Sequence, residues 1–303
     1  MEPKYQRMDG ADFYEKLKTE EQAREWIWKS RFDGKDFVCT GCGSEEFYQY
    51  QCDPEVRKCR ACRLQVRLRV GTLFESSNLP LLVWVRAIWW AMQGKRGISA
   101  WELKRQLKMR SYQTTWGMLH KIRRALRNRD DRYQLKQIVE LDGATFGKRE
   151  FPHQETVLVA IETKDWIDEK GRQKSKAGFA KVMVKPETTI YAKRFTEQAL
   201  KPGTLINTDG ALCYDKIEGA DSQIMNQDKD VLDRWLPWVH KFISNAKTWL
   251  LGTHHRATSK YLESYLAEYT YRFNRRHDPN SLFHRALTAC SLASPMTLGE
   301  LCG

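Results

Sequence analysis

Two Cys-x-x-Cys pairs near the N-terminus constrain the fold of this chain more than any other feature. Cys39 and Cys42 are followed, after sixteen residues, by Cys59 and Cys62. A Cys-x-x-Cys turn presents two thiolates to one ion, and two such turns complete the tetrahedral shell of a structural Zn²⁺. The spacing therefore predicts a zinc ribbon. The competing interpretation, a redox pair, needs a single Cys-x-x-Cys in a thioredoxin-like context.

The distribution of charge predicts a polyanionic partner. The 303 residues carry a formal net charge of +13 at pH 7, and a chain of this length predicts two or three domains. The charge is clustered, because the stretch 94–132 holds twelve Lys or Arg against three acids. Clustering favours nucleic acid over the alternative, a basic protein with no nucleic-acid role.

The sequence predicts a cytoplasmic protein without a membrane partner. Its most apolar run, at 79–92, contains Arg86 and predicts a buried helix rather than a membrane span. The segment MEPKYQRMDG lacks the apolar core of a signal peptide. Cysteines in metal-type pairs also favour a reducing compartment.

The basic stretch predicts a helix-turn-helix. The run 98–126 predicts a helix, a short turn and a second helix, with Trp101 and Leu103 among the residues expected to face a core. Its polar side chains suit base edges and phosphates in a major groove. The expected DNA-binding residues are Lys104, Arg105, Gln113, Thr114, Lys121, Arg123 and Arg124. A helix pair with a solvated basic face is the alternative.

The second half of the chain mixes strands and helices in an order that matches an RNase H-like sheet. Strands are predicted at 137–142, 156–162, 180–184 and 204–208, with a helix at 188–200 before the last of them. The polar stretch 168–176 predicts a hairpin turn or loop. Long helices are predicted at 231–251 and 259–276. In an RNase H-like sheet the first and fourth strands lie side by side.

The chain as a whole is predicted to be a multidomain α/β protein without internal repeats. A helical lead (1–36) precedes the zinc ribbon (37–75) and the helix-turn-helix DNA-binding segment (79–132). The RNase H-like mixed α/β catalytic domain (137–280) and a C-terminal tail (281–303) follow.

Two acids occupy unusual places in the predicted sheet. Asp142 ends the run IVEL and Asp209 follows LINT, and each precedes a glycine. Carboxylates at the ends of core strands are costly unless a cation binds them. A two-metal site is a common way to cut and join phosphodiesters, so the pair predicts a divalent-metal site. A plain Asp-Gly turn is the alternative at each position.

The helix predicted at 231–251 offers a third ligand. His240 and Lys247 are seven residues apart and share one flank of its apolar stripe, whereas Asn245 lies on the other flank. Histidine supplies a ring nitrogen and asparagine a carbonyl oxygen, so either can serve as a ligand.

The helix predicted at 259–276 carries three charged residues on one face. Glu268, Arg272 and Arg275 are spaced i, i+4 and i+7. This spacing is typical of a functional group of side chains or of a simple surface ion pair, and the sequence leaves both open.

With these motifs in place, the sequence resembles a family of insertion-sequence transposases, the ISXO-like transposases. These proteins join an N-terminal zinc ribbon to a DDE-type, RNase H-like domain. The matching stretches cover nearly the whole chain in order: CTGC, CRAC, GTLFESSNLPL, KRGISAWELKRQL, VELDGATFGK, LINTDG, LLGTHH and YLESYLAEYTYRFNRR. The resemblance implies cleavage and transfer of DNA strands with Mg²⁺, or Mn²⁺ in its place, and a structural Zn²⁺.

Carried over residue by residue, the resemblance makes Asp142 and Asp209 the first two acids, which would bridge two Mg²⁺ ions. His240 aligns with the third, usually acidic, position when Lys247 is placed on the family's lysine, and Lys247 would contact phosphate. Glu268 matches the glutamate of the family's Glu-Arg-Arg signature and could supply the missing carboxylate.

The resemblance implies a transposase that binds the terminal inverted repeats of its element. Its partners would be double-stranded DNA, at the element ends and the target, and further copies of the chain in a synaptic oligomer. Arg272 and Arg275, the arginines of the signature, are expected to contact DNA. The expected location is the nucleoid in the cytoplasm of a bacterial or archaeal cell. A catalytically inactive DNA-binding regulator and a nuclease without joining activity stay open as alternatives.

Overall fold

The computed structural model of this chain describes residues 8–147, 154–167, 169–221, 235–255 and 258–302. The chain divides into two compact units. The first combines Met1–Arg129 with His277–Gly303, and the second spans Asp130–Arg276. The expected helical lead, zinc ribbon and nearly all of the expected helix-turn-helix segment therefore belong to one unit.

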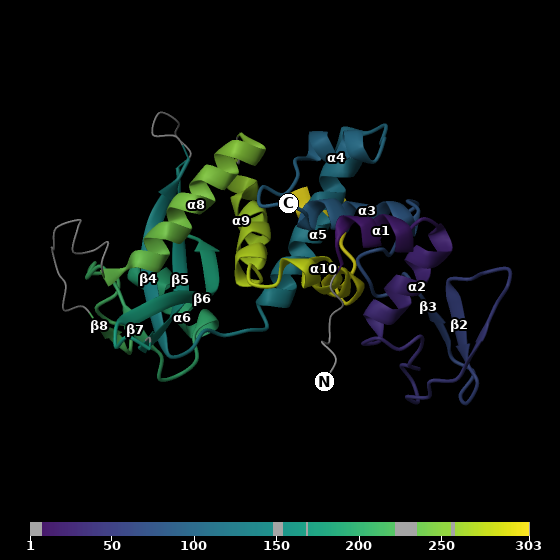
Figure 1. Cartoon of the computed structure of the whole chain (residues 1–303), viewed down its shortest axis with the longest axis horizontal. Helices are drawn as coiled ribbons and strands as arrows, with labels where there is room; N and C mark the ends of the chain where they lie inside the picture. Colours follow the sequence, from purple (N-terminus) through teal and green to yellow (C-terminus); the bar gives the residue numbers. More distant parts are fainter. Residues whose placement is uncertain (1–7, 148–153, 168, 222–234, 256–257, 303) are drawn as a thin grey trace. The chain divides into compact units, whose positions relative to one another are not determined.

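The first unit is mainly helical and contains one small sheet (Figure 1). Its elements are α1 (Gly10–Lys16), α2 (Glu20–Arg31), β1 (Phe47–Gln49), β2 (Val56–Cys59), β3 (Gln65–Arg67), α3 (Leu81–Met92), α4 (Ala100–Gln106), α5 (Tyr112–Asp130), η1 (Pro279–Ser281), α10 (Leu282–Ser291) and α11 (Leu298–Cys302). The three strands are antiparallel in the order β1-β2-β3. Two successive helices, α4 and α5, lie in the stretch for which a helix-turn-helix was predicted, and that motif itself stays a prediction.

The start of α3 is capped by a side chain from a distant helix. Pro80 precedes α3 and offers no side-chain cap. Instead, the N–H groups of Leu81 and Leu82 donate to the carboxylate of Glu20 at 2.6 and 2.9 Å. A carboxylate at a helix N-terminus satisfies unpaired N–H groups and interacts favourably with the helix dipole. Glu20 is the first residue of α2, so this contact ties α2 to α3.

The zinc ribbon packs on α2 through a buried arginine. Arg57, on β2, is 2% exposed. Its guanidinium lies 4.6 Å from the ring centroids of Trp28 and Phe47, and it pairs with Glu25 at 2.7 Å. A buried guanidinium is stable only when rings and acceptors replace its water. The contact therefore holds the small sheet against the helical part of the first unit.

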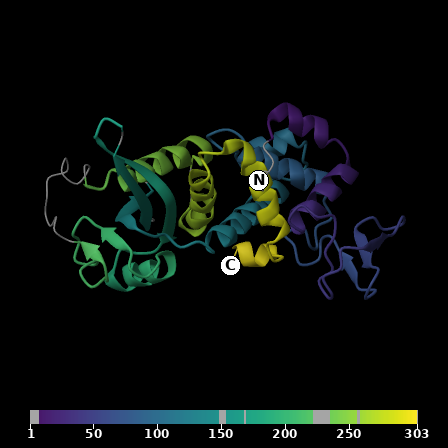
Figure 2. The same ribbon diagram turned by 60° about the horizontal axis from the view of Figure 1, so that its bottom comes forward.

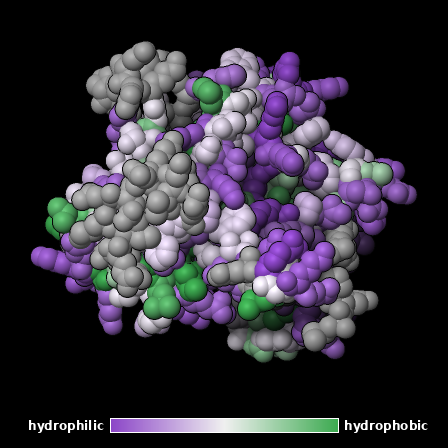
Figure 3. Space-filling model, turned by 60° about the vertical axis from the view of Figure 1, so that its left-hand side comes forward, coloured by the Kyte–Doolittle hydropathy of each residue, from purple (hydrophilic) through white to green (hydrophobic). Residues whose placement is uncertain are grey.

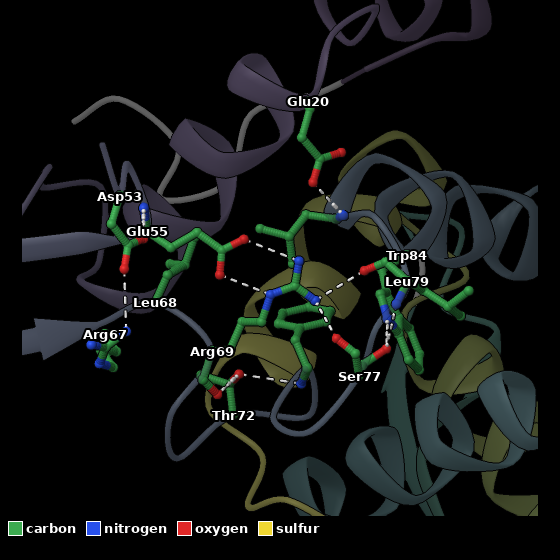
Figure 4. A network of polar contacts seen from close by, with 12 residues as sticks. Glu20, Asp53, Glu55, Arg67, Leu68, Arg69, Thr72, Ser77, Leu79 and Trp84 are labelled. Atoms are coloured by element: carbon green, nitrogen blue, oxygen red, sulfur yellow. Dashed lines mark hydrogen bonds and ion pairs between the residues drawn. The ribbon is translucent and has the colours of Figure 1, made fainter. Parts of the chain in front are cut away.

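A second arginine organises the segment between the ribbon and α3 (Figure 4). Arg69 makes a bidentate ion pair with Glu55, at 2.8 and 3.0 Å, and donates to the carbonyls of Ser77 and Leu79 at 2.9 Å each. The hydroxyl of Ser77 also accepts from the indole N–H of Trp84 at 2.9 Å. Planar guanidinium groups suit such fork-like pairing. The irregular chain before α3 is thereby held in place without regular secondary structure.

The C-terminal residues are part of the first unit's core, where the sequence predicted a tail. Phe283, on α10, packs against Phe13 and Trp89 with ring centroids 5.4 and 5.3 Å apart. Phe13 and Trp89 stack at 4.1 Å. The helices α10, α2 and α3 contact one another (Figure 2). Burial of large aromatic rings stabilises this arrangement, which is why the segment is not a free tail.

The second unit is a five-stranded mixed sheet covered by helices on both faces. Its elements are β4 (Ile138–Phe146), β5 (Glu155–Ile167), β6 (Gln173–Val184), α6 (Thr189–Ala199), β7 (Leu205–Asn207), β8 (Ala220–Asp221), α8 (Pro237–His254) and α9 (Ser259–Asn274). The strand order is β6-β5-β4-β7-β8. β4 and β7 pair in parallel, which places the first and fourth predicted strands side by side.

The helices α8 and α9 lie over one face of this sheet and α6 over the other (Figure 1), and a hydrophobic core lies on each face. On one face, Val157 and Val159 pack with Val239 of α8 and Leu266 of α9. On the other face, residues of β4 and β5 pack with α6 and with Tyr214. Alternate strand residues point to opposite faces, so a sheet buried on both sides reads as a nearly continuous apolar run.

The strands differ from the predicted ranges in one way that matters for the site. β4 continues through Gly143 to Phe146, so Asp142 lies inside the strand and is not followed by a turn. Asp209, in contrast, follows β7. In the long hairpin of β5 and β6, residues 173–176 of the predicted turn or loop belong to β6, and residue 168 lies outside the described residues. The helix predicted from 231 is described from Pro237 onward, because 222–234 lies outside the described residues.

A bilayer requires apolar character of the surface and of the helices that enter it. The residues visible in Figure 3 are mostly hydrophilic, and the hydrophobic ones form small separate spots. None of the described helices is long and apolar enough to cross a bilayer.

Candidate active site and zinc cluster

The four paired cysteines lie together in the first unit. Their sulphurs all lie within 4.8 Å of one another. Cys39 and Cys59 are buried, Cys42 and Cys62 are exposed, and all four are free thiols. In the described part of the chain, no other group of His, Cys, Asp or Glu side chains is as compact. Four thiolates with no open position fit a structural Zn²⁺.

Two similar turns aim the sulphurs inward. The N–H of Gly43 donates to the carbonyl of Cys39 at 2.9 Å, and the N–H of Arg63 donates to that of Cys59 at 3.2 Å. Both donors have positive φ, +74° for Gly43 and +64° for Arg63, a conformation that glycine adopts most easily. The N–H of Cys62 donates to the sulphur of Cys59 and lowers the pKa of that thiol to about 6. The turn therefore favours the thiolate that a metal needs.

Asp142 and Asp209 approach each other at one edge of the second unit's sheet. In the parallel pairing of β4 with β7, Glu140 lies opposite Asn207. Asp142 and Asp209 each follow two residues later, so the register of the two strands brings them close together. Burial raises the pKa of Asp209 and the charge of Asp142 raises it further, although the N–H of Ala211 donates to Asp209 and opposes this.

His240 extends from α8 to this acid pair. Its Nε2 lies 3.4 Å from Oδ2 of Asp142. Asn245 and Lys247 are both exposed, and Lys247 Nζ lies 5.4 Å from the centroid of the Phe146 ring, where β4 ends. Asn245 lies about 140° around the helix from His240. Of the predicted third ligands, His240 is therefore the one that the structure brings to Asp142.

Glu140 holds α8 in the position from which His240 reaches the acids. It is 2% exposed, and its Oε2 accepts from the N–H groups of Trp238 and Val239 at 2.8 Å each. The hydroxyl of Thr163 donates to its other oxygen at 3.1 Å. Burial raises the pKa of Glu140, while the two N–H donors oppose the shift. The sequence signal was available, because an acid two residues before Asp142 lies on the same face of a strand.

A second glutamate, Glu187, lies close to the acid pair and was not predicted. Oε1 of Glu187 accepts a hydrogen bond of 2.6 Å from the hydroxyl of Tyr214. Burial raises the pKa of Glu187, the hydrogen bond from Tyr214 opposes this, and the charges of Asp142 and Asp209 raise it again. It lies between β6 and α6, and it does not directly follow an apolar run, the pattern that identified Asp142 and Asp209 in the sequence.

The predicted Glu-Arg-Arg group, on α9 and at its end, is largely buried. Glu268 is 1% exposed, with Oε1 3.9 Å from Nη1 of Arg272. Arg275 pairs with Asp130 at 2.6 Å, and its guanidinium lies 3.5 Å from the centroid of the Tyr271 ring. The side chains of both arginines are about nine-tenths buried. Their predicted contact with DNA stays a prediction, although burial leaves little of either guanidinium accessible in this structure.

Most of the predicted DNA-binding residues of α4 and α5 lie at the surface. Arg105, Gln113, Thr114 and Arg124 are exposed, and Lys104 and Lys121 are partly exposed. Arg123 is the exception at 2% exposure. It lies near His120, whose pKa falls to about 3 because of burial and, second, the charge of Arg123. Arg123 is therefore not presented on the surface in this structure, and its contact with DNA stays a prediction.

Trp101 is exposed, although the sequence predicted that it faces a core. It is 62% exposed, because Ala100 and Leu103 form the buried side of the short helix α4. Its ring lies 4.9 Å from that of Tyr112, and Nζ of Lys104 lies 5.1 Å from its centroid. A large aromatic ring beside a cation is therefore presented on the surface of the helix pair.

The donor set around the acid pair fits a divalent cation. Asp142 and Asp209 offer carboxylate oxygens, which Mg²⁺ and Mn²⁺ prefer, and His240 adds a nitrogen that Mn²⁺ accepts more readily than Mg²⁺. Two partly buried carboxylates repel each other when both are ionised, and a bound cation stabilises their ionised forms. The three side chains are more widely spaced than the cysteines, since they do not form a group within 4.8 Å among the described residues.

A mixed sheet with adjacent first and fourth strands, and acids where they meet, belongs to the RNase H-like class. Residues 134–274 match the model of the ISXO2-like transposase domain. The match, to a family of DDE transposases, covers nearly all of the second unit and none of the first. Comparisons with curated proteins and with solved structures find no match.

Proposed function

We propose that this protein is a transposase that binds the terminal inverted repeats of an insertion sequence and cuts and joins DNA strands with divalent metal. The observation that carries the proposal is the parallel pairing of β4 with β7, which brings Asp142 and Asp209 together. His240 completes the group at 3.4 Å from Asp142. The family match of the second unit supports the same function.

The chemistry assigns a task to each residue of this group. Asp142, Asp209 and His240 would hold Mg²⁺ or Mn²⁺, which activates a water or a 3′-hydroxyl and stabilises the leaving 3′-oxygen. Glu140 fixes the N-terminus of α8 and thereby the place of His240. Lys247, exposed two turns further along α8, contacts a DNA phosphate as a point charge. No covalent intermediate with the protein is required.

The first unit supplies the DNA-binding surface in this proposal. The exposed and partly exposed residues of the helix pair are Lys104, Arg105, Gln113, Thr114, Lys121 and Arg124. Cations of this kind neutralise phosphates, and amide and hydroxyl side chains read base edges. Trp101 adds a ring on which a base can stack. The four cysteines hold a structural Zn²⁺ that orders the ribbon.

The setting follows from this activity. A transposase that synapses two element ends works as an oligomer on double-stranded DNA. We accordingly propose that copies of this chain assemble on the paired ends, in the nucleoid of a bacterial or archaeal cytoplasm.

The experiment that tests the proposal is a strand-transfer assay with DNA that carries the element's inverted ends. With Mg²⁺ or Mn²⁺ we expect nicked ends and joined products from the wild-type protein. Asp142→Ala and Asp209→Ala should bind the same DNA and produce neither. A wild-type protein that binds the ends and never nicks them would show that the proposal is wrong.

His240 gives a reason to test a second function. A histidine stands where a third carboxylate is expected, which lowers the affinity for Mg²⁺. A catalytically inactive, DNA-binding regulator would bind the ends with both metals and cut with neither. A nuclease without joining activity would release cut ends and no recombinant product, so the same assay separates all three functions.

A further inference from the structure

We propose that Glu187 supplies a third carboxylate to the metal site of Asp142 and Asp209, in place of the acid that α8 lacks. The inference rests on the proposed function, because it takes the two aspartates to be metal ligands. It concerns a residue that lies between β6 and α6, far from α8 in the chain. Three observations carry it: the space at Gly143, the hydrogen bond from Tyr214 and the proximity of the three acids.

The first observation is that β4 leaves room for the Glu187 carboxylate at the residue after Asp142, on the face of the sheet that Tyr214 covers. Gly143 directly follows Asp142, and a Cβ built on Gly143 would lie under 3.0 Å from the carboxylate carbon and both oxygens of Glu187. The φ of Gly143 is not in the left-handed region, so backbone conformation does not require a glycine there. The close approach of Glu187 does require one.

The second observation is that a buried hydroxyl fixes this carboxylate from one side. Tyr214 is fully buried, and its hydroxyl donates to Oε1 of Glu187 at 2.6 Å. The thiol of Cys213 lies 4.0 Å from the same oxygen. Among the described residues, the hydroxyl of Tyr214 and the thiol of Cys213 both approach Oε1, so Oε2 is able to coordinate an ion. A neighbour that orients a ligating carboxylate in this way is typical of metal sites.

The third observation is the charge that gathers at this edge of the sheet. The charges of Asp142 and Asp209 both act on Glu187, although among the described residues these three acids do not form a group within 4.8 Å. Three neighbouring carboxylates repel one another, and the hydroxyl of Tyr214 carries no charge to offset this. A hard divalent cation prefers oxygen ligands and removes the repulsion. Because His240 would donate a nitrogen, a third carboxylate would raise the number of oxygen ligands at the site, and oxygen is the ligand atom that such a cation prefers.

The test is Mn²⁺ binding to the zinc-loaded full chain, measured by titration calorimetry and by the electron paramagnetic resonance of free Mn²⁺. Glu187→Gln removes the charge, and Gly143→Ala leaves every charge in place but displaces the Glu187 carboxylate. We expect each to weaken Mn²⁺ binding by about 10- to 100-fold, the range for groups that tune a metal site. Glu197→Gln, an exposed glutamate on α6, is the matched control and should bind as the wild type does.

Asp142→Asn separates this inference from the proposed function. If Asp142→Asn loses Mn²⁺ affinity while Glu187→Gln and Gly143→Ala keep it, the metal site stands and the role of Glu187 is wrong. If Asp142→Asn also binds like the wild type, both are wrong. Thermal unfolding without Mn²⁺ identifies a purely structural role: Glu187→Gln would lower the melting temperature and leave Mn²⁺ affinity unchanged, which overturns the inference.

Discussion

The cysteine cluster and the acid pair are both predicted metal sites, and they are assembled in opposite ways. The cluster takes its ligands from the single stretch 39–62, in which two similar turns place four sulphurs within 4.8 Å. The acid site takes Asp142 from a strand, Asp209 from the residues after another strand and His240 from a helix. The first site depends on local turns, whereas the second depends on the order and register of a whole sheet.

This difference has an energetic consequence. The ribbon has three strands of three or four residues, so little of its own core can hold it together without metal. The acid site lies on a sheet with a hydrophobic core on each face. That core positions the carboxylates close together even though they repel one another. The ribbon should therefore need its ion to fold, and the acid site should need its ion only to act.

The largest expected effect is that of zinc removal. Chelation should unfold the ribbon, because structural Zn²⁺ contributes roughly 10 kcal/mol or more to small zinc domains. The sheet of the second unit should stay folded. Hydrogen exchange, read segment by segment, checks this: amides of β1 to β3 should lose protection and those of β4 and β5 should keep it. Equal loss in both regions would contradict the contrast between the sites.

Next in size is the effect of neutralising the acids. Asp142→Asn or Asp209→Asn should reduce strand transfer by about 1000-fold, since metal supplies several kcal/mol to such reactions and each 1.4 kcal/mol is tenfold. The variants should be as stable as the wild type or more so, because a repulsion is removed. Strand-transfer rates and urea unfolding measure the two effects. Asp165→Asn, an exposed acid on β5, is the control and should change neither.

A smaller effect should follow from breaking the buried ion pair of the second unit. Arg275→Met removes the cationic partner of the buried Asp130 carboxylate and leaves it with the amide of Asn274, which should cost about 3 kcal/mol of unfolding free energy. The double variant with Asp130→Asn should recover part of the loss. Urea unfolding provides the values. A large loss of DNA affinity with unchanged stability would instead restore Arg275 as a DNA-binding residue.

The third metal ligand should matter less than the two acids. His240→Ala should reduce strand transfer by about 10- to 100-fold, a typical cost for a group that tunes a metal site. Asn245→Ala should have a smaller effect, because Asn245 is exposed on another flank of α8. Rates with Mg²⁺ and with Mn²⁺ should be compared for both variants. The opposite order of effects would make Asn245 the ligand.

The smallest expected effect concerns the exposed ring of the helix pair. Trp101→Ala should weaken DNA binding by about 1 to 2 kcal/mol if a base stacks on the ring. Trp101→Phe should retain most of the affinity, and neither variant should change strand transfer at saturating DNA. Equilibrium binding and the quenching of tryptophan fluorescence measure this. If Trp101→Ala binds DNA with unchanged affinity, the ring does not contribute to binding, and the charged residues around it account for the affinity.

Patterns that depend on neighbouring residues were predictable from the sequence. The cysteine spacing predicted the cluster, and apolar runs predicted the strands that became β4 to β7 within a few residues, except that β5 and β6 are several residues longer. The helices α6 and α9 match their predicted ranges closely. Spacing and periodicity reflect local backbone geometry, which does not depend on contacts with distant segments.

Other features could not be predicted because they depend on which distant side chains cover a residue. Trp101 is a residue type expected in a core, yet it is exposed. Arg123 is a residue type expected to contact DNA, yet it is buried. The sequence predicted a tail after residue 281, but in the structure Phe283 packs against Phe13 and Trp89.

The sequence by itself predicted the cluster of four cysteines, the succession of strands along the chain and the two aspartates of the candidate site. Only the tertiary structure decided that β4 and β7 pair in parallel, that His240 reaches Asp142, and that Glu187 fills the space beside Gly143. The physical reason is that four ligands in two short turns need only local backbone geometry. A site drawn from two strands, a loop and a helix exists only after hydrophobic burial has fixed the register of the sheet.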